Sequence, residues 1–185
     1  MKTKTHDLVY SAICLALCLV LPFLTGQIPE IGSMLCPMHL PVMLAGFICG
    51  PAWAAAVGFI APLLRFAIFG MPVIVPAGIS MAFELATYGA VVGLLYNKLS
   101  KKTYNIYVSL VVAMIAGRIV WAAVRAVISG AGGAPFTWAI FIASGFTQAI
   151  PGINQQLVLI PVIVIALQKA KIIKKNVQNS CYARR

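Results

Sequence analysis

Acidic residues are almost absent from this sequence: Asp and Glu together occur three times in 185 residues, against fourteen Lys and Arg. Charged residues of all kinds make up only 9% of the chain, whereas 62% of the residues are hydrophobic. A soluble globular domain has about 25% charged residues, so the composition excludes that class. We expect an integral membrane protein, with one domain over residues 1–185 and no separate catalytic module.

The motifs of common enzymes and molecular motors are also missing. The sequence contains no G-x-x-x-x-G-K-[ST] motif, which excludes a P-loop nucleotide site, and it shows no Ser-His-Asp set, paired carboxylates or obvious internal repeat. Its five cysteines lack the paired spacing of a zinc site or a disulfide framework, and Cys36 with His39 forms only a lone C-x-x-H. We therefore expect no enzyme, no metal and no cofactor.

Hydropathy and the Gly and Pro breaks predict an all-α membrane protein with six transmembrane helices. The expected ranges are 8–24, 38–50, 52–69, 78–96, 106–128 and 152–172. The second range is short for a full span and contains Pro41. The first range could belong to a signal peptide, but no A-x-A-like cleavage site follows it and its apolar run of about 17 residues is long enough to span.

The basic residues predict the orientation of these helices. Eleven of the fourteen fall in three hydrophilic segments: the N-terminus, the 97–105 loop and the C-terminal tail from Lys169 onwards. An even number of spans places all three segments on one side, which the positive-inside rule makes cytoplasmic. The net charge of +11 therefore indicates anchoring in a lipid bilayer with both termini in the cytoplasm, and no nucleic-acid partner.

The other three basic residues, Arg65, Arg118 and Arg125, lie within apolar segments, as does Glu84. An ionisable residue at membrane depth costs about 3 kcal/mol on insertion scales, so we expect these side chains to face the bundle interior. The predicted topology puts them in the outer half or near the midplane. The polar residues of the bundle are thus expected to gather toward the outside.

Arg118 and Arg125 lie seven residues apart and share one face of their helix. One of them can pair with Glu84, or the excess positive charge can bind an anionic solute, because a guanidinium donates two parallel hydrogen bonds to a carboxylate. Arg118, near mid-membrane, is the better candidate for the ion pair, and Arg125 for the solute. Further candidates for the solute site are Arg65, His39, Trp121, Asn154 and Gln155, while Tyr88, four residues after Glu84, fits either the core or the site.

Small residues mark a second surface of interest. Ala12 and Ala16 form an A-x-x-x-A motif in the first helix, near its predicted cytoplasmic end. Small residues at this spacing allow another helix to approach closely. The motif is common by chance in Ala-rich spans, so on its own it indicates only a possible interface.

Taken together, six predicted helices in under 200 residues, basic cytoplasmic ends, the A-x-x-x-A motif and outward polar groups resemble the substrate-binding S components of energy-coupling factor (ECF) vitamin transporters. The segments MLCPMHLPVMLAGFICGP (34–51) and FGMPVIVPAGISMAFELATYG (69–89) are similar to those of a bacterial branch of this family. The resemblance covers essentially the whole chain.

This resemblance implies a six-helix S-component bundle in the bacterial plasma membrane that captures a water-soluble vitamin or precursor from outside. It implies as partners a transmembrane T component, which would contact Ala12 and Ala16, and two ECF ATPases. The binding loops of the family carry over only by region, to 25–37 and to the connection between the third and fourth helices.

The identity of the solute is less constrained. The positive excess favours an acidic solute, with pantothenate or another carboxylate first. A neutral vitamin such as pyridoxine or hydroxymethylpyrimidine would require an arginine and Glu84 to pair with each other. The alternative from another class is a small intramembrane enzyme or a channel, in which His39 or Glu84 would be needed for turnover.

Overall fold

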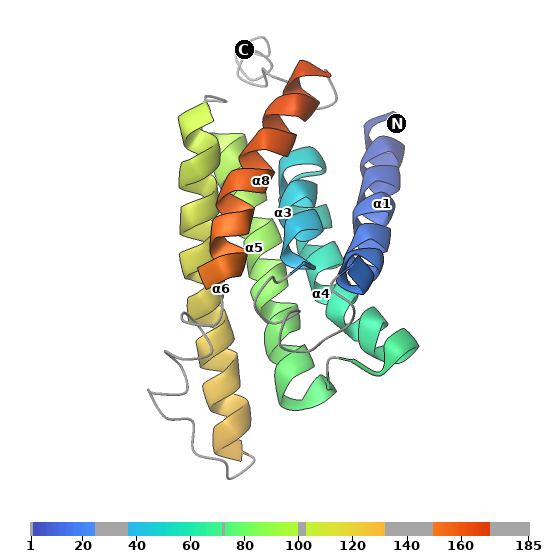
Figure 1. Ribbon diagram of the computed structural model, residues 1–185, viewed down its shortest axis with the longest axis vertical. Helices are drawn as coiled ribbons and strands as arrows, with labels where there is room; N and C mark the ends of the chain where they lie inside the picture. The colour runs from blue at the N-terminus through green and yellow to red at the C-terminus, as the bar shows by residue number, and fades with distance from the viewer. Residues whose placement is uncertain (1, 25–36, 72, 100–102, 132–149, 171–185) are drawn as a thin grey trace, which may run out of the picture.

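The structure is a computed structural model that describes residues 2–24, 37–71, 73–99, 103–131 and 150–170 (Figure 1). Its elements are α1 (Lys2–Leu24), α3 (His39–Ile48), α4 (Pro51–Phe69), the π-helix η1 (Ile74–Gly78), α5 (Ile79–Lys98), α6 (Thr103–Ala131) and α8 (Ile150–Lys169). These ranges contain no strand, and the all-α prediction is confirmed. Each predicted helix has a counterpart, although α1 begins at Lys2 and not at residue 8.

Within the described residues, five helical stretches are long and apolar enough to cross a membrane: Thr5–Phe23, Pro51–Phe69, Ile74–Lys98, Thr103–Gly130 and Gly152–Lys169. The chain is therefore a multi-pass membrane protein. The remaining helix, α3, has 10 residues, which corresponds to about 15 Å or half the hydrocarbon thickness. Most of its side chains are buried against neighbouring helices, and the count of six spans remains a prediction.

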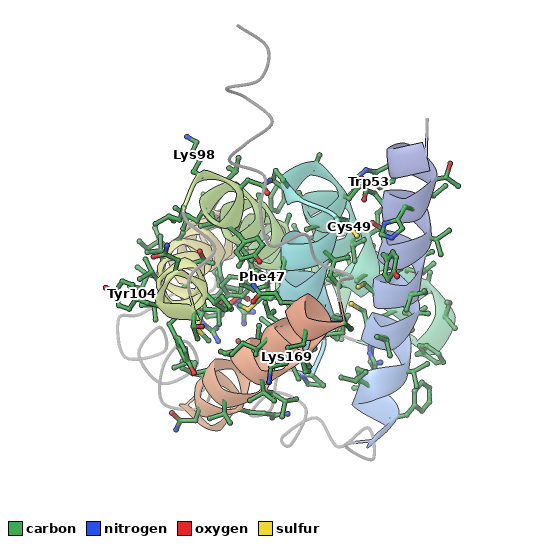
Figure 2. The ribbon with its side chains drawn as sticks, turned by 90° about the horizontal axis from the view of Figure 1, so that it is seen from above. Phe47, Cys49, Trp53, Lys98, Tyr104 and Lys169 are labelled. Atoms are coloured by element: carbon green, nitrogen blue, oxygen red, sulfur yellow. The ribbon has the colours of Figure 1, made fainter. Side chains whose placement is uncertain are left out.

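Successive helices alternate in direction, as Figure 1 shows. The start of α1, the end of α5, the start of α6 and the end of α8 lie at the upper end of the molecule. Figure 2 views the molecule from this end, where Lys98 and Lys169 are labelled. A shared cytoplasmic side requires such a gathering of basic helix ends, while the orientation in the membrane remains a prediction.

Two glycines set the ends of α4. Gly50 has a φ of 88° and directly precedes Pro51, the first residue of the helix. Proline suits that position because its missing N–H would have no partner in the first turn. At the other end Gly70 adopts the left-handed conformation, with a φ of 72°, and its N–H donates to the carbonyl of Phe66.

Close backbone contacts hold α4 against α5. A Cβ atom added to Gly58 would lie 2.5 Å from the backbone of Leu85, and one added to Gly89 would lie 2.6 Å from the carbonyl oxygen of Ala54. Only glycine permits this separation, because real Cβ atoms do not approach so closely. The packing places α5 among α3, α4 and α6 in the centre of the bundle (Figure 1). Polar side chains on α5 therefore face other helices.

Candidate solute-binding site

Three polar side chains surround Glu84, which is only 3% exposed. The hydroxyl of Tyr88 donates to Glu84 Oε1 over 2.7 Å, and Arg118 Nη1 lies 3.2 Å from the same oxygen. His39 Nε2 lies 3.8 Å from it, which is near enough for electrostatic attraction but too far for a hydrogen bond. We call these residues, His39, Glu84, Tyr88 and Arg118, the Glu84 cluster. The predicted pair between Arg118 and Glu84 is present.

The helices bring the cluster together in a simple way. Glu84 and Tyr88 are four residues apart on α5 and thus share one face of it. His39 comes from the start of α3, where its ring lies 5.3 Å from that of Tyr88. Arg118 comes from α6, which packs against α5. Three helices therefore each supply part of the site.

Gly117 makes this arrangement possible on α6. A Cβ atom at this position would overlap the Tyr88 ring. The Tyr88 ring therefore lies directly against the backbone of α6, and its hydroxyl reaches Glu84. The sequence shows a small residue beside Arg118, but it does not reveal which side chain uses the space.

A second group of side chains continues along α6. The Arg118 and Arg125 guanidinium carbons lie 6.0 and 5.8 Å from the centroid of the Trp121 ring. Both distances are within the range of a cation–π interaction. Trp121 is 9% exposed and Arg125 is half-buried. Trp121 thus lies between the guanidinium of Arg118, which pairs with Glu84, and the guanidinium of Arg125, which is two helical turns from Arg118.

Arg65 lies elsewhere. Its Nη1 donates to the backbone carbonyl of Leu19 over 3.2 Å, and its guanidinium carbon lies 5.9 and 5.6 Å from the ring centroids of Phe23 and Phe69. These contacts join α1 to α4. The structure therefore does not bring Arg65, a predicted candidate for the solute site, to the Glu84 cluster.

The three polar residues near the start of α8, residues 154–156, differ in how deeply they are buried. Asn154 is exposed, Gln155 is half-buried and Gln156 is 3% exposed. The Gln155 Oε1 atom is buried and has no hydrogen-bond partner in the described part of the chain. The sequence analysis selected Asn154 and Gln155; the structure shows that Gln156 is the most buried of the three.

One hydrogen bond joins α8 to α5 at the far end of α8: Gln168 Nε2 donates to the hydroxyl of Tyr96 over 2.8 Å. The two helices run in the same direction, but α8 is tilted and begins beside the middle of α5, near the start of α3 (Figure 1). Because α8 packs against α3 and α6, the amide side chains near its start lie toward the end of α3 that carries His39.

Ala12 and Ala16 are both exposed on α1. Exposed apolar residues surround them on the same helix, including Leu8, Ile13 and Val20. The predicted contact with a partner is untested, but the surface on which it depends is open in this chain.

No group of three or more His, Cys, Asp or Glu side chains lies together as a metal site within residues 2–24, 37–71, 73–99, 103–131 and 150–170. Cys36, the other half of the C-x-x-H, lies outside the described residues, as do Glu30 and nearly all of the predicted 25–37 binding loop. His39 itself belongs to the Glu84 cluster.

A family model described as "ECF transporter, substrate-specific component" matches residues 6–172 of the chain. Searches of curated proteins and of solved structures find no match. The family match agrees with the apolar helices and with a polar cluster buried among them. This chain therefore belongs to the family of ECF transporter substrate-specific components, the membrane subunits that bind the substrate for transport.

Proposed function

We propose that the chain acts as a single unit over residues 1–185 that captures a small water-soluble vitamin or precursor outside the bacterial plasma membrane. A T component and two ATPases would supply the energy for uptake. The observation that carries this proposal is the Glu84 cluster: four polar side chains inside apolar helices are costly unless they serve a function.

The class of solute rests on the arginines. A carboxylate such as pantothenate would bind Arg125, whose described contact is with Trp121 and which has no acidic partner in the described ranges. A neutral vitamin such as pyridoxine or hydroxymethylpyrimidine would bind at the Glu84 cluster itself. The ion pair between Arg118 and Glu84 supports this second class, because it neutralises the cluster.

Binding to the isolated chain tests the proposal. The full chain, purified in detergent, is titrated calorimetrically with a panel of vitamins and precursors. We expect stoichiometric binding of one panel member without chemical change, and weaker binding when Glu84 is replaced by Gln. A folded chain that binds no member would contradict a solute-binding subunit, and turnover that is lost in the His39→Ala variant would indicate an intramembrane enzyme instead.

The partner surface requires a separate experiment. Replacement of both Ala12 and Ala16 by Leu is expected to abolish uptake and co-purification with the T component, because bulky side chains keep a second helix away. Solute affinity of the isolated variant should stay unchanged, since both residues are exposed on α1. A matched variant, Leu17→Phe, enlarges an exposed α1 residue about 100° or more around the helix from both alanines. Normal uptake by the double variant would remove this surface from the proposal.

A further inference from the structure

Several buried polar atoms near the Glu84 cluster have no hydrogen-bond partner among the described residues. They are both ring nitrogens of His39, which is 3% exposed, and Oε1 of Gln155. Buried polar groups in folded proteins are almost always hydrogen-bonded, since an unmade bond costs free energy. A solute bound beside these atoms would supply the hydrogen bonds that they lack.

The unsatisfied atoms belong to one region of the bundle. His39 is the first residue of α3 and lies beside Glu84 and Tyr88, and Gln155 is the sixth residue of α8, which begins at about the height of the start of α3 (Figure 1). The helices that carry them, α3 and α8, pack against each other. One small molecule in this region can reach both side chains.

The hydrogen-bonding capacity of these groups restricts the molecule. An imidazole in its neutral form offers one N–H donor and one acceptor nitrogen, whereas the Gln155 oxygen only accepts. A partner must therefore bring at least one donor, for Gln155, together with an acceptor or a further donor for His39. A carboxylate group offers acceptors alone, so a solute that met these side chains through its carboxylate would leave the Gln155 oxygen unsatisfied.

The charges around His39 also disfavour an anionic solute. Glu84 and Arg118 form an ion pair, so their charges offset each other, and Glu84 Oε1 already accepts a hydrogen bond from Tyr88. Because His39 Nε2 lies only 3.8 Å from this carboxylate oxygen, an anion hydrogen-bonded to His39 would stand close to a like charge. An uncharged molecule avoids that repulsion.

We propose that His39 and Gln155 are direct solute contacts, and that the solute is uncharged and carries both donor and acceptor groups. An amino- or hydroxy-substituted nitrogen heterocycle meets these requirements, and the rings of His39, Tyr88 and Trp121 provide aromatic surroundings for it. The inference deepens the proposed function and rests on it.

Matched pairs of solutes test the charge requirement. The purified full chain is titrated at pH 7.5 with pantothenol against pantothenate, and pyridoxine against 4-pyridoxate, each pair differing at one position by a hydroxymethyl or carboxylate group. Hydroxymethylpyrimidine is added as a further uncharged probe. The uncharged member of the pair that binds should bind at least tenfold more tightly than its carboxylate.

Substitutions then test the contacts. His39→Phe keeps an aromatic ring but removes both nitrogens, and should weaken binding of the uncharged probe at least tenfold, whereas His39→Gln, which keeps a donor and an acceptor, should recover part of the affinity. Gln155→Leu should also weaken binding. Val158→Ala, at an exposed position on the same helix, serves as the control and should leave affinity unchanged.

The outcomes separate this inference from the proposed function. If only the anionic probes bind, or if His39→Phe and Gln155→Leu bind the uncharged probe as the parent chain does, the inference is wrong while the proposed function stands. If no probe and no other vitamin binds the folded chain, the proposed function fails, and the inference fails with it.

Discussion

At the scale of single residues, the ion pair between Glu84 and Arg118 dominates the energetics of the site. Both side chains are buried or nearly so, with exposed fractions of 3% and 12%. Removing one member of a buried pair leaves the other charge without compensation, which typically costs about 3–5 kcal/mol. We expect Arg118→Met to lower the free energy of unfolding by this amount, measured by denaturant unfolding in detergent micelles.

The double variant provides the internal check on that prediction. In Glu84→Gln with Arg118→Met no uncompensated charge remains, so the combined loss should be smaller than the sum of the two single losses. Arg125→Met, which removes only the contact with Trp121, should cost about 1 kcal/mol. Strictly additive losses for Glu84 and Arg118 would mean that the two charges are not coupled.

Gly117 allows a second residue-scale prediction. In Gly117→Ala the added methyl group meets the Tyr88 ring, and overpacking of this kind costs about 1–3 kcal/mol. The Tyr88 hydroxyl should then move from Glu84, so both the free energy of unfolding and the solute affinity should fall. Both quantities are measured on the purified variant.

Gly130→Ala is the matched control on the same helix. An added Cβ there has nothing within 4 Å, and alanine favours helix by up to about 1 kcal/mol. This variant should be at least as stable as the parent chain. Equal effects of the two substitutions would show that helix propensity, and not contact with Tyr88, determines the result.

The sequence predicted some of these residue contacts and not others. Counting charges inside apolar segments indicated that an arginine can pair with Glu84 or bind an anionic solute, and the depth of Arg118 favoured it over Arg125 for the pair. The spacing of Glu84 and Tyr88 on one helical face left the role of Tyr88 open. Arg65 was a candidate for the solute site, whereas in the structure it donates to a backbone carbonyl of α1, and no pattern of side chains reveals such a partner.

At the scale of helices, Arg65 joins α1 to α4. Replacing it with Met removes a hydrogen bond from a charged donor and two aromatic contacts, so we expect a loss of about 2 kcal/mol in the free energy of unfolding. Solute affinity should change less than twofold, because these contacts lie outside the Glu84 cluster. Unfolding and calorimetry on the same preparation measure both effects. A large loss of affinity at unchanged stability would return Arg65 to the solute site.

Helix boundaries were well predicted where glycine or proline marks them. Gly50 with Pro51, and Gly70, end the helices close to where the sequence indicated. The depth of α3 in the bundle was harder to predict. Its apolar run fits a lipid-facing span and a short buried helix equally well, and only the packing of α3 against α5, α1 and α4 distinguishes them.

At the scale of the whole molecule, the gathering of helix ends predicts a measurable orientation. In a variant with all five native cysteines replaced, a single cysteine at Asn97 should react in intact cells only with a membrane-permeant maleimide. A cysteine at Met71, near the opposite end of α5 and 46% exposed, should react with an impermeant reagent. The reverse pattern would invert the assignment of the cytoplasmic side.

The class of the molecule followed from its sequence, because apolar length and basic loops are properties of composition. The packing of α3, α5, α6 and α8 against one another did not, since it depends on contacts such as that of Gln168 with Tyr96, which are 72 residues apart.

Trp121 gives this arrangement an optical consequence. The emission of an indole depends on the electric field across its ring, and two guanidinium groups contribute to that field here, with their carbons 6.0 and 5.8 Å from the ring centroid. A molecule that moves either group would shift the fluorescence. The protein thus contains its own spectroscopic reporter one turn from the Glu84 cluster, and no attached dye is needed to follow occupancy in real time.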